Sequence, residues 1–230
     1  MKVIKNIILI LFLVGLGIVL YYGINGYNLY KKLITETPLE EKIKSIRDNK
    51  NYTKLEDISP DFINAVIAVE DHRFYSHSGI DIISTIKAIF INVKEASYVT
   101  GGSTITQQLA KNMYFSQEKK MLRKVAEMFM TYELEDVLDK DEILELYVNT
   151  IYYGSGYYNV RSASLGYFSK EPSELTLDEA SLLAGIPNAP SVYSLDVNPD
   201  LAYQRQKQVI SAMKEYDYIN DLEYKELIKK

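Results

Sequence analysis

The chain has 230 residues, with 31 acidic and 26 basic side chains and no cysteine. The net charge of −5 excludes a general nucleic-acid binder, which carries a basic excess, and the lack of cysteine excludes disulfides, thiol catalysis and thiolate metal sites. With 47% hydrophobic and 25% charged residues, the composition predicts a globular protein with one sizeable domain and an appendage.

Residues 1–30 are interpreted as a cytoplasmic tip followed by a transmembrane anchor. Residues 6–30 contain no charged side chain, and about 20 apolar residues suffice to cross a bilayer core. A cleaved signal peptide is the alternative, but cleavage sites favour alanine and none occurs before Ala65. Two lysines lie on each side of the apolar run, so the positive-inside rule only weakly favours a cytoplasmic N-terminus. That orientation places most of the chain outside the cytoplasm.

Residues 31–56 are charged and poor in aromatic side chains, which predicts a stalk or linker with a short helix at Leu39–Ile46. The domain, residues 57–220, is predicted to be mostly α-helical with no convincing set of strands, and residues 221–230 to be a C-terminal tail. Apolar spacing together with start and stop signals predicts its helices. They are one that begins at Pro60 after Ser59 as N-cap, Ile82–Glu95, Thr104–Met113, Lys120–Leu138, Asp141–Asn149, Leu177–Ile186 after a capping box at Thr176, and Asp200–Tyr216.

The first stretch with chemical potential is Glu70-Asp-His-Arg-Phe-Tyr-Ser-His-Ser-Gly79, which follows an apolar run. A carboxylate directly after such a run is partly desolvated, which makes it a better proton acceptor. The structural alternative is a helix that ends in a polar turn. A metal site built on His72 and His77 is disfavoured, because the chain has two histidines and no sign of a further ligand. We expect His77 to fix the loop through hydrogen bonds.

The second stretch is Gly101-Gly-Ser-Thr-Ile-Thr-Gln-Gln-Leu-Ala-Lys-Asn112. A glycine turn at a helix N-terminus can present free N–H groups to an anion, and Gln108 and Lys111 fall on one helix face. An N-capped helix with a polar outer face is the alternative. It explains Ser103 but not so long a polar string with so little charge. The glycine–lysine spacing of a P-loop is absent.

The third stretch, Lys119-Lys-Met-Leu-Arg-Lys-Val-Ala-Glu127, holds four cations and one acid in an otherwise acidic chain. One interpretation is a phosphate-binding edge beside a second carboxylate. The alternative, favoured for this stretch alone, is an exposed helix face with an Arg123–Glu127 pair.

These motifs occur in order and are followed by Glu-Ile-Leu-Glu-x-Tyr-x-Asn, which ends at Asn149. Together they make the chain resemble the peptidoglycan glycosyltransferases of family 51, that is, the transglycosylase domain of class A penicillin-binding proteins and the monofunctional enzymes. The resemblance covers roughly Asp57 to Tyr218. It implies an α-rich, lysozyme-like fold with a large lobe and a smaller, membrane-proximal lobe.

The resemblance implies that lipid II is polymerised into β-1,4-linked glycan with release of undecaprenyl pyrophosphate. Glu70 then matches the general base, which deprotonates the 4-hydroxyl of the acceptor sugar so that it attacks and inverts C1 of the donor. Glu127 matches a second glutamate that assists departure of the pyrophosphate, directly or through a divalent metal. The matched phosphate-binding positions are Lys111, Lys119, Arg123 and Lys124. The matched donor-site lining is Ser103, Thr104, Gln107, Gln108 and Asn112.

The sequence requires no cofactor, although a Mg²⁺ or Mn²⁺ ion near Glu127 stays open. The implied partners are lipid II, the growing glycan strand and the bacterial plasma membrane, in which the chain would be a single-pass protein with its catalytic domain on the extracytoplasmic face. Three Ser-x-x-Lys matches lack the Lys-Thr-Gly that a penicillin-binding site needs. We therefore expect a monofunctional enzyme that works with a separate transpeptidase, and no nucleic-acid partner.

Four positions depart from the family pattern. Asn159 and Arg161 stand where the family usually has Gly and Glu, and Tyr153 and Ser169 replace the usual Phe and Gly. They belong to a motif that we expect to be mostly structural. Two other functions stay open: a lytic muramidase, because two carboxylates on a lysozyme-like fold also cleave glycans, and a catalytically idle protein that binds lipid II or partner synthases.

Overall fold

The computed structural model describes residues 2–94, 101–115 and 121–229, and these ranges contain helices and no strand. The prediction of a mostly α-helical chain is therefore confirmed. The helices are α1 (Lys2–Glu36), α2 (Leu39–Arg47), α3 (Pro60–Glu70), α4 (Ile82–Lys94), α5 (Ile105–Tyr114), α6 (Met121–Val137), α7 (Lys140–Val148), α8 (Val160–Phe168), α9 (Leu177–Gly185), α10 (Pro190–Tyr193), α11 (Pro199–Glu215) and α12 (Asp221–Ile228).

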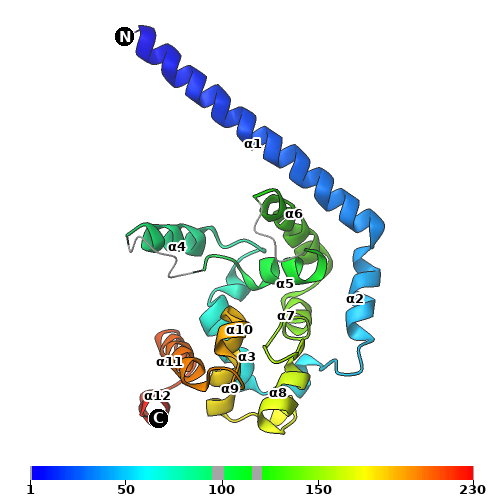
Figure 1. Ribbon diagram of the computed structural model, residues 1–230, viewed down its shortest axis with the longest axis vertical. Helices are drawn as coiled ribbons and strands as arrows, with labels where there is room; N and C mark the ends of the chain where they lie inside the picture. Colours follow the sequence, from blue (N-terminus) through cyan, green and yellow to red (C-terminus); the bar gives the residue numbers. More distant parts are fainter. Residues whose placement is uncertain (1, 95–100, 116–120, 230) are drawn as a thin grey trace.

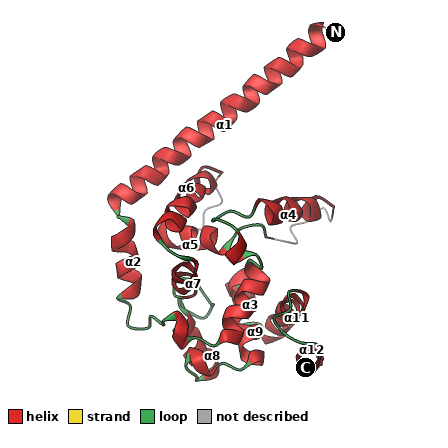
Figure 2. Ribbon diagram, turned by 180° about the vertical axis from the view of Figure 1, so that it is seen from behind, coloured by secondary structure: helices red, strands yellow, loops and turns green. Residues whose placement is uncertain are grey.

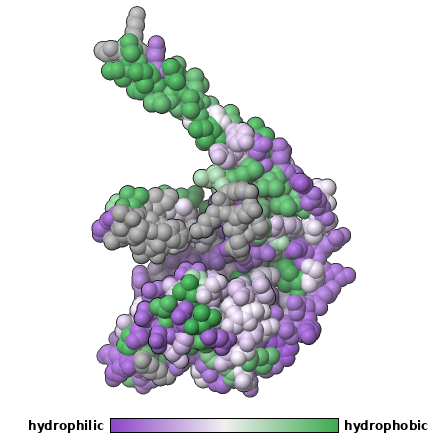
Figure 3. All heavy atoms as spheres, in the orientation of Figure 1, coloured by the Kyte–Doolittle hydropathy of each residue, from purple (hydrophilic) through white to green (hydrophobic). Residues whose placement is uncertain are grey.

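Helix α1 projects away from the other helices, with the N-terminus at its far end (Figure 1). The stretch Val3–Glu36 is the one helix in the described ranges that is long and apolar enough to cross a membrane, with a mean hydropathy of 2.7. Figure 3 shows its free part as a hydrophobic rod. The helix continues past the predicted boundary at Tyr30, because its last turns pack on α6.

The core is built around α3, which packs between α9 and α11, while α5 packs on α6 and α7 (Figures 1 and 2). Phe62 from α3, Leu109 from α5, Met130 from α6 and Tyr147 from α7 are fully buried. Burial of one such side chain stabilises the fold by about 1.5–3 kcal/mol. This packing fixes the ends of α3, α5 and α6 relative to one another.

Helix α4 stands apart from this core (Figures 1 and 2). Its predicted apolar positions include Ile82, Ile86, Phe90 and Val93, and each of these side chains is more than 60% exposed. The spacing correctly predicted a helix, but the apolar face has no partner within the described residues.

Local signals placed several helix starts correctly. Thr176 caps α9 in the predicted capping box, and Pro60 opens α3. Ser59 occupies the N-cap position but does not cap, because its hydroxyl donates to the carbonyl of Leu175 instead. Helix α7 begins earlier than predicted, because Asp139 forms a capping box of its own.

Helices α8 and α12 were not predicted. Asn159 caps α8 by accepting from the backbone N–H of Ser162, which gives this departure from the family pattern a structural role. Arg161 forms an ion pair of 2.8 Å with Glu171, and Ser169 ends α8 with a φ of 56°. Helix α12 lies in the predicted C-terminal tail, and its Leu227 is buried in the core.

Candidate active site

A cavity of about 680 Å³ lies between the ends of α3, α5 and α6 and the segment from α9 to α11. It brings together Glu70 and Glu127, which are far apart in sequence. Its lining also includes Val69, Gly101, Ser103, Gln107, Gln108, Lys111, Lys124, Pro187, Asn188, Tyr193, Arg205 and Gln208. The cleft therefore combines two carboxylates with several cations and amides.

Glu70 is the last residue of α3, and its side chain is 11% exposed. Its Oε2 accepts a hydrogen bond of 2.7 Å from the side-chain amide of Gln108, whereas Oε1 is buried with no hydrogen-bond partner among the described residues. The guanidinium of Arg205 lies 3.9 Å from Oε1. Tyr147 in turn donates to the amide oxygen of Gln108, over 3.2 Å. The carboxylate is thus held in one orientation while one oxygen stays available.

Glu127 is 1% exposed, so the alternative favoured for this stretch alone, an exposed helix face with an Arg123–Glu127 pair, is wrong about the exposure of Glu127. The predicted Arg123–Glu127 pair is present, with 2.8 Å between Nε and Oε1. Lys124 adds a second ion pair of 3.2 Å to Oε2, and its ammonium also donates to the hydroxyl of Ser103, over 2.9 Å. Two cations compensate a carboxylate that could not stay buried alone.

Lys111 lies in the same cavity, on α5. Burial lowers the pKa of its ammonium below the ordinary lysine value. Arg123 and Lys124 lower this pKa further by repulsion, whereas the charges of Glu127 and Glu70 oppose them. The cleft therefore holds cations close enough together to repel one another, with Glu127 and Glu70 as opposing charges.

The proposed anion site at the N-terminus of α5 is not formed, because the first N–H groups of the helix have protein partners. Thr104 and Gln107 make a reciprocal capping box, and the N–H of Ile105 donates to Oδ2 of Asp71, over 3.1 Å. The hydroxyl of Thr104 also donates to the carbonyl of Gly79. Thr104 thus has a structural role, and any anion must be bound by side chains instead.

The remaining residues of the Glu70 stretch form a structural cluster. Nε2 of His77 lies 3.0 Å from both carboxylate oxygens of Asp71, so the expectation that His77 fixes the loop is confirmed. Asp81 is held by Arg73 and by Ser84. Although burial opposes the effect, these contacts hold the pKa of Asp81 well below its usual range. The ligand atoms of Asp71, His77 and Asp81 lie within 4.8 Å of one another. The hydrogen bonds and ion pairs that these side chains make within the protein account for this clustering without a metal.

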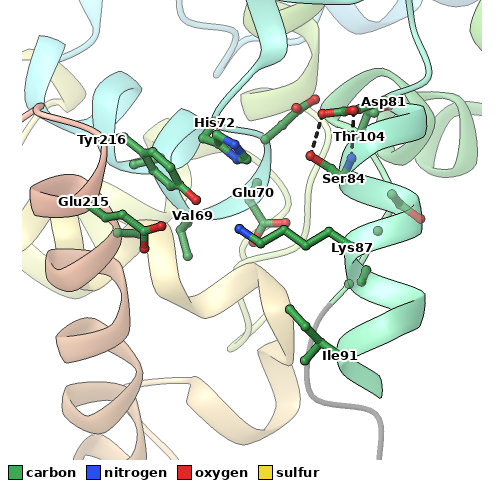
Figure 4. A pocket seen from close by; sticks show the side chains of 17 residues that line it. Val69, Glu70, His72, Asp81, Ser84, Lys87, Ile91, Thr104, Glu215 and Tyr216 are labelled. Carbon is green, nitrogen blue, oxygen red and sulfur yellow. Dashed lines mark hydrogen bonds between the residues drawn. The ribbon is translucent and has the colours of Figure 1, made fainter. Parts of the chain in front are cut away.

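A second cavity of about 270 Å³ meets the first at Glu70 (Figure 4). Its walls come from α3, α4 and α11. Lys87 extends from α4 toward Glu70, and the ring of His72 stacks on Tyr216 with centroids 4.1 Å apart. Glu70 thus lies in the lining of both cavities, the larger of which holds three cations and two carboxylates among its described residues.

The structure places most, but not all, of the predicted substrate-binding residues at the cleft. Arg123 reaches it through its ion pair with Glu127, whereas Asn112 is half-buried on α5 and does not line it. Lys119 lies outside the described residues.

Sequence reasoning missed Arg205 and Gln208. They come from α11, which carries no local sign of chemistry. The one sequence signal for Arg205 is Gly185 at the end of α9, because a Cβ there would lie 3.0 Å from Cγ of Arg205. The lack of a side chain at Gly185 lets Arg205 pass along α9 to the cleft.

Comparison with known proteins gives a consistent result. Residues 37–214 match the family model described as Transglycosylase. The chain is 42% identical over 179 residues to penicillin-binding protein 1A of Aquifex aeolicus (strain VF5), and 47% identical over 166 residues to that of Neisseria lactamica. These alignments cover 78% and 72% of this chain but 25% and 21% of the relatives, so the chain spans a quarter or less of their length.

Among solved structures, the chain is similar to the crystal structure of penicillin-binding protein 1A from Haemophilus influenzae. The match has 25% identity and a TM-score of 0.47, and covers 78% of this chain and 17% of that one.

Proposed function

Because the chain belongs to the transglycosylase family, we propose that it is a membrane-anchored peptidoglycan glycosyltransferase that polymerises lipid II and releases undecaprenyl pyrophosphate. The observation that carries the proposal is the position of Glu70, with one oxygen that has no hydrogen-bond partner among the described residues, in a cleft whose other groups suit a pyrophosphate. The support is chemical: a glycosyl transfer of this kind needs a base for the acceptor and a site for an anionic leaving group.

Glu70 acts as the general base in this proposal. Gln108 holds Oε2, so Oε1 faces the incoming 4-hydroxyl of the acceptor sugar and takes its proton. The freed oxygen attacks C1 of the donor sugar and forms the new glycosidic bond as the bond to pyrophosphate breaks. Attack and departure occur on opposite sides of C1, which inverts it into a β link. The two cavities that meet at Glu70 suit this geometry, with the acceptor in the smaller one and the donor in the cationic cleft.

The pyrophosphate is stabilised by cations in the cleft. Lys111, Lys124 and Arg205 line it and supply charge-assisted hydrogen bonds to phosphate oxygens. Glu127 assists departure by holding Lys124 and Arg123 in position, since it pairs with both. Charge that develops on the leaving group then meets donors that are already oriented, which lowers the barrier without reorganisation of the site.

The described residues do not fit a metal ion held by the protein beside Glu127. Its oxygens pair with Arg123 and Lys124, and Lys111 and Arg205 add positive charge to the same cleft. A divalent cation there would meet repulsion and few free oxygen ligands. The basic side chains of the cleft therefore neutralise the leaving group in this proposal.

The anchor and the exposed apolar face of α4 suit a substrate whose lipid stays in the membrane. The proposed topology is a single pass with the catalytic domain on the extracytoplasmic face of the bacterial cell membrane. The proposed product is uncross-linked glycan, to be cross-linked by a separate transpeptidase. Because the chain has no cysteine, one cysteine at the exposed position Lys207 tests the topology in whole cells. An impermeant thiol reagent should label it without lysis.

The activity is tested with the full chain in phospholipid vesicles that contain lipid II. We expect glycan strands from the wild type and a loss of about 10²–10⁴-fold in Glu70→Gln. Undiminished polymerisation by Glu70→Gln would exclude Glu70 as the base. Release of soluble fragments from purified sacculi would favour the muramidase, whereas tight lipid II binding without strands would favour the idle binding protein.

A further inference from the structure

The last turns of the anchor helix pack directly on the helix that carries Glu127. Helices α1 and α6 contact each other, and both ribbon views show them side by side (Figures 1 and 2). The rings of Tyr27 and Tyr30 lie 5.3 and 5.9 Å from that of Phe129, and Tyr30 donates a hydrogen bond to Glu133. The anchor helix thus packs on α6, one of the helices whose residues line the cleft.

At Gly26 this contact leaves no room for a side chain. A Cβ on Gly26 would lie 2.5 Å from Cγ1 and 2.8 Å from Cβ of Val125, closer than real Cβ atoms approach, and 3.4 Å from the backbone nitrogen of Ala126. Gly26 is buried, whereas a Cβ on Gly23 of the same helix would meet nothing within 4 Å. Glycine is required at one of these positions and not at the other.

The residues of α6 that contact the anchor are neighbours in sequence of residues that line the cleft. Val125 and Ala126 lie between Lys124 and Glu127 in sequence, and the latter two line the cleft. Neighbouring residues of a helix point in different directions, so α6 presents Val125 to the anchor and its charged groups to the cleft. Pressure on Val125 therefore moves the backbone that carries Glu127 and its cations.

We propose that Gly26 is a positioning residue for helix α6, which carries Glu127. Because Gly26 has no side chain, α1 packs closely against Val125, and we call this packing contact the seat of α1. The seat sets the position of Glu127, Arg123 and Lys124 in the cleft. The proposal rests on the proposed function for its catalytic consequence, but the seat itself is a property of the fold. It makes the anchor a part of the active-site framework as well as a tether.

The test compares Gly26→Ala and Gly26→Leu with Gly23→Ala and Gly23→Leu in the full chain, reconstituted in vesicles. The Gly23 variants are matched controls, since they add the same groups to the same helix at a position where a Cβ meets nothing within 4 Å. We expect Gly26→Leu to lower kcat by roughly 10- to 100-fold, the effect of misplacing a reacting group by about 1 Å, with KM changed far less. Both Gly23 variants should keep the wild-type kcat.

Rescue separates positioning from general damage. Val125→Gly removes the side-chain atoms that a Cβ at position 26 would meet, so the Gly26→Ala/Val125→Gly double variant should recover kcat relative to Gly26→Ala. The single Val125→Gly variant measures the loss in kcat and Tm that glycine within α6 causes by itself. Equal kcat in the Gly26→Leu and Gly23→Leu variants, or no recovery in the double variant, would overturn the proposal.

Thermal unfolding of the same variants separates this proposal from the proposed function. If the wild type makes no glycan, the proposed function fails. The packing contact between Gly26 and Val125 is then tested by the Tm values of the variants alone. A loss in Tm for Gly26→Ala that Val125→Gly reverses supports the seat whatever the activity. Additive losses would refute it.

Discussion

Gln108 donates a hydrogen bond from its side-chain amide to Oε2 of Glu70, over 2.7 Å, whereas Oε1 is buried without a hydrogen-bond partner in the described part of the chain, 3.9 Å from the guanidinium of Arg205. The two residues come from different helices, α5 and α3. A single bond thus fixes the rotation of the proposed base and keeps its reactive oxygen open.

The first prediction concerns Gln108. Gln108→Leu removes the bond to Glu70, so the carboxylate loses its fixed orientation. Because a hydrogen bond to a charged group is worth about 1.5–3 kcal/mol, we expect kcat for lipid II polymerisation to fall roughly 10- to 100-fold. Binding of inorganic pyrophosphate, measured by calorimetry, should change little, because the cations remain. Gln204→Leu, on the exposed face of α11, is the control. A larger loss of pyrophosphate affinity than of kcat would contradict this role.

The second prediction concerns pH. Burial, followed by repulsion from Arg123 and Lys124, lowers the pKa of Lys111, although Glu127 and Glu70 oppose this. A lysine loses its charge as the pH rises through its pKa, so a lowered pKa moves that loss to lower pH. Affinity for inorganic pyrophosphate should therefore weaken on the alkaline side earlier than it does in Lys111→Arg, whose guanidinium stays charged. Identical alkaline profiles for the two proteins would show that Lys111 does not carry the binding.

The third prediction concerns metal ions. In the proposed mechanism Lys111, Lys124 and Arg205 neutralise the leaving pyrophosphate, and Glu127 is already paired with cations. We expect the rate of polymerisation to persist after dialysis against a strong chelator, within about twofold. Loss of activity that added Mg²⁺ or Mn²⁺ restores would instead require a metal bound with the substrate.

The fourth prediction concerns stability. Ser169 ends α8 in the left-handed region, with a φ of 56°, where a side chain is strained and glycine is not. Ser169→Gly should raise the free energy of unfolding by roughly 0.5–1 kcal/mol, seen as a higher Tm, with activity unchanged. Ser211→Gly, in the interior of α11, should lower stability by a similar amount. A lower Tm for Ser169→Gly would show that the serine contributes contacts that outweigh the strain.

The sequence predicted the helices whose signals are local. Apolar spacing placed α4, α5 and α6, and the capping box at Thr176 placed the start of α9. Helix α8 was missed because its signal is weak: Asn159 is its only clear start residue, and serines and aromatics interrupt its apolar pattern. Helix α12 was missed because its apolar contacts, such as that of Leu227, depend on packing against distant residues.

The motifs also predicted most residues of the candidate site, but not which of them pair within the protein and which line the cleft. Glu70, Glu127, Lys111 and Lys124 were named from their motifs, and all four line one cleft. The same motifs could not show that N–H groups at the start of α5 have partners within the protein, because the N–H of Ile105 donates to Asp71, which lies directly after α3. Nor could they reveal Arg205, because its place in the cleft depends on how α9 and α11 pack.

The cations gathered in one cleft affect the electrostatic field that an approaching anionic substrate meets. The chain as a whole is acidic, while Lys111, Lys124 and Arg205 line one concave region with low-dielectric walls. Such an arrangement focuses field lines into the opening and repels anions elsewhere. In the proposed membrane location, anionic lipid headgroups would be repelled by the outer surface but would compete for the cleft itself. Capture of substrate should accordingly slow as ionic strength rises, because the attraction reaches only about one Debye length, near 8 Å at physiological salt.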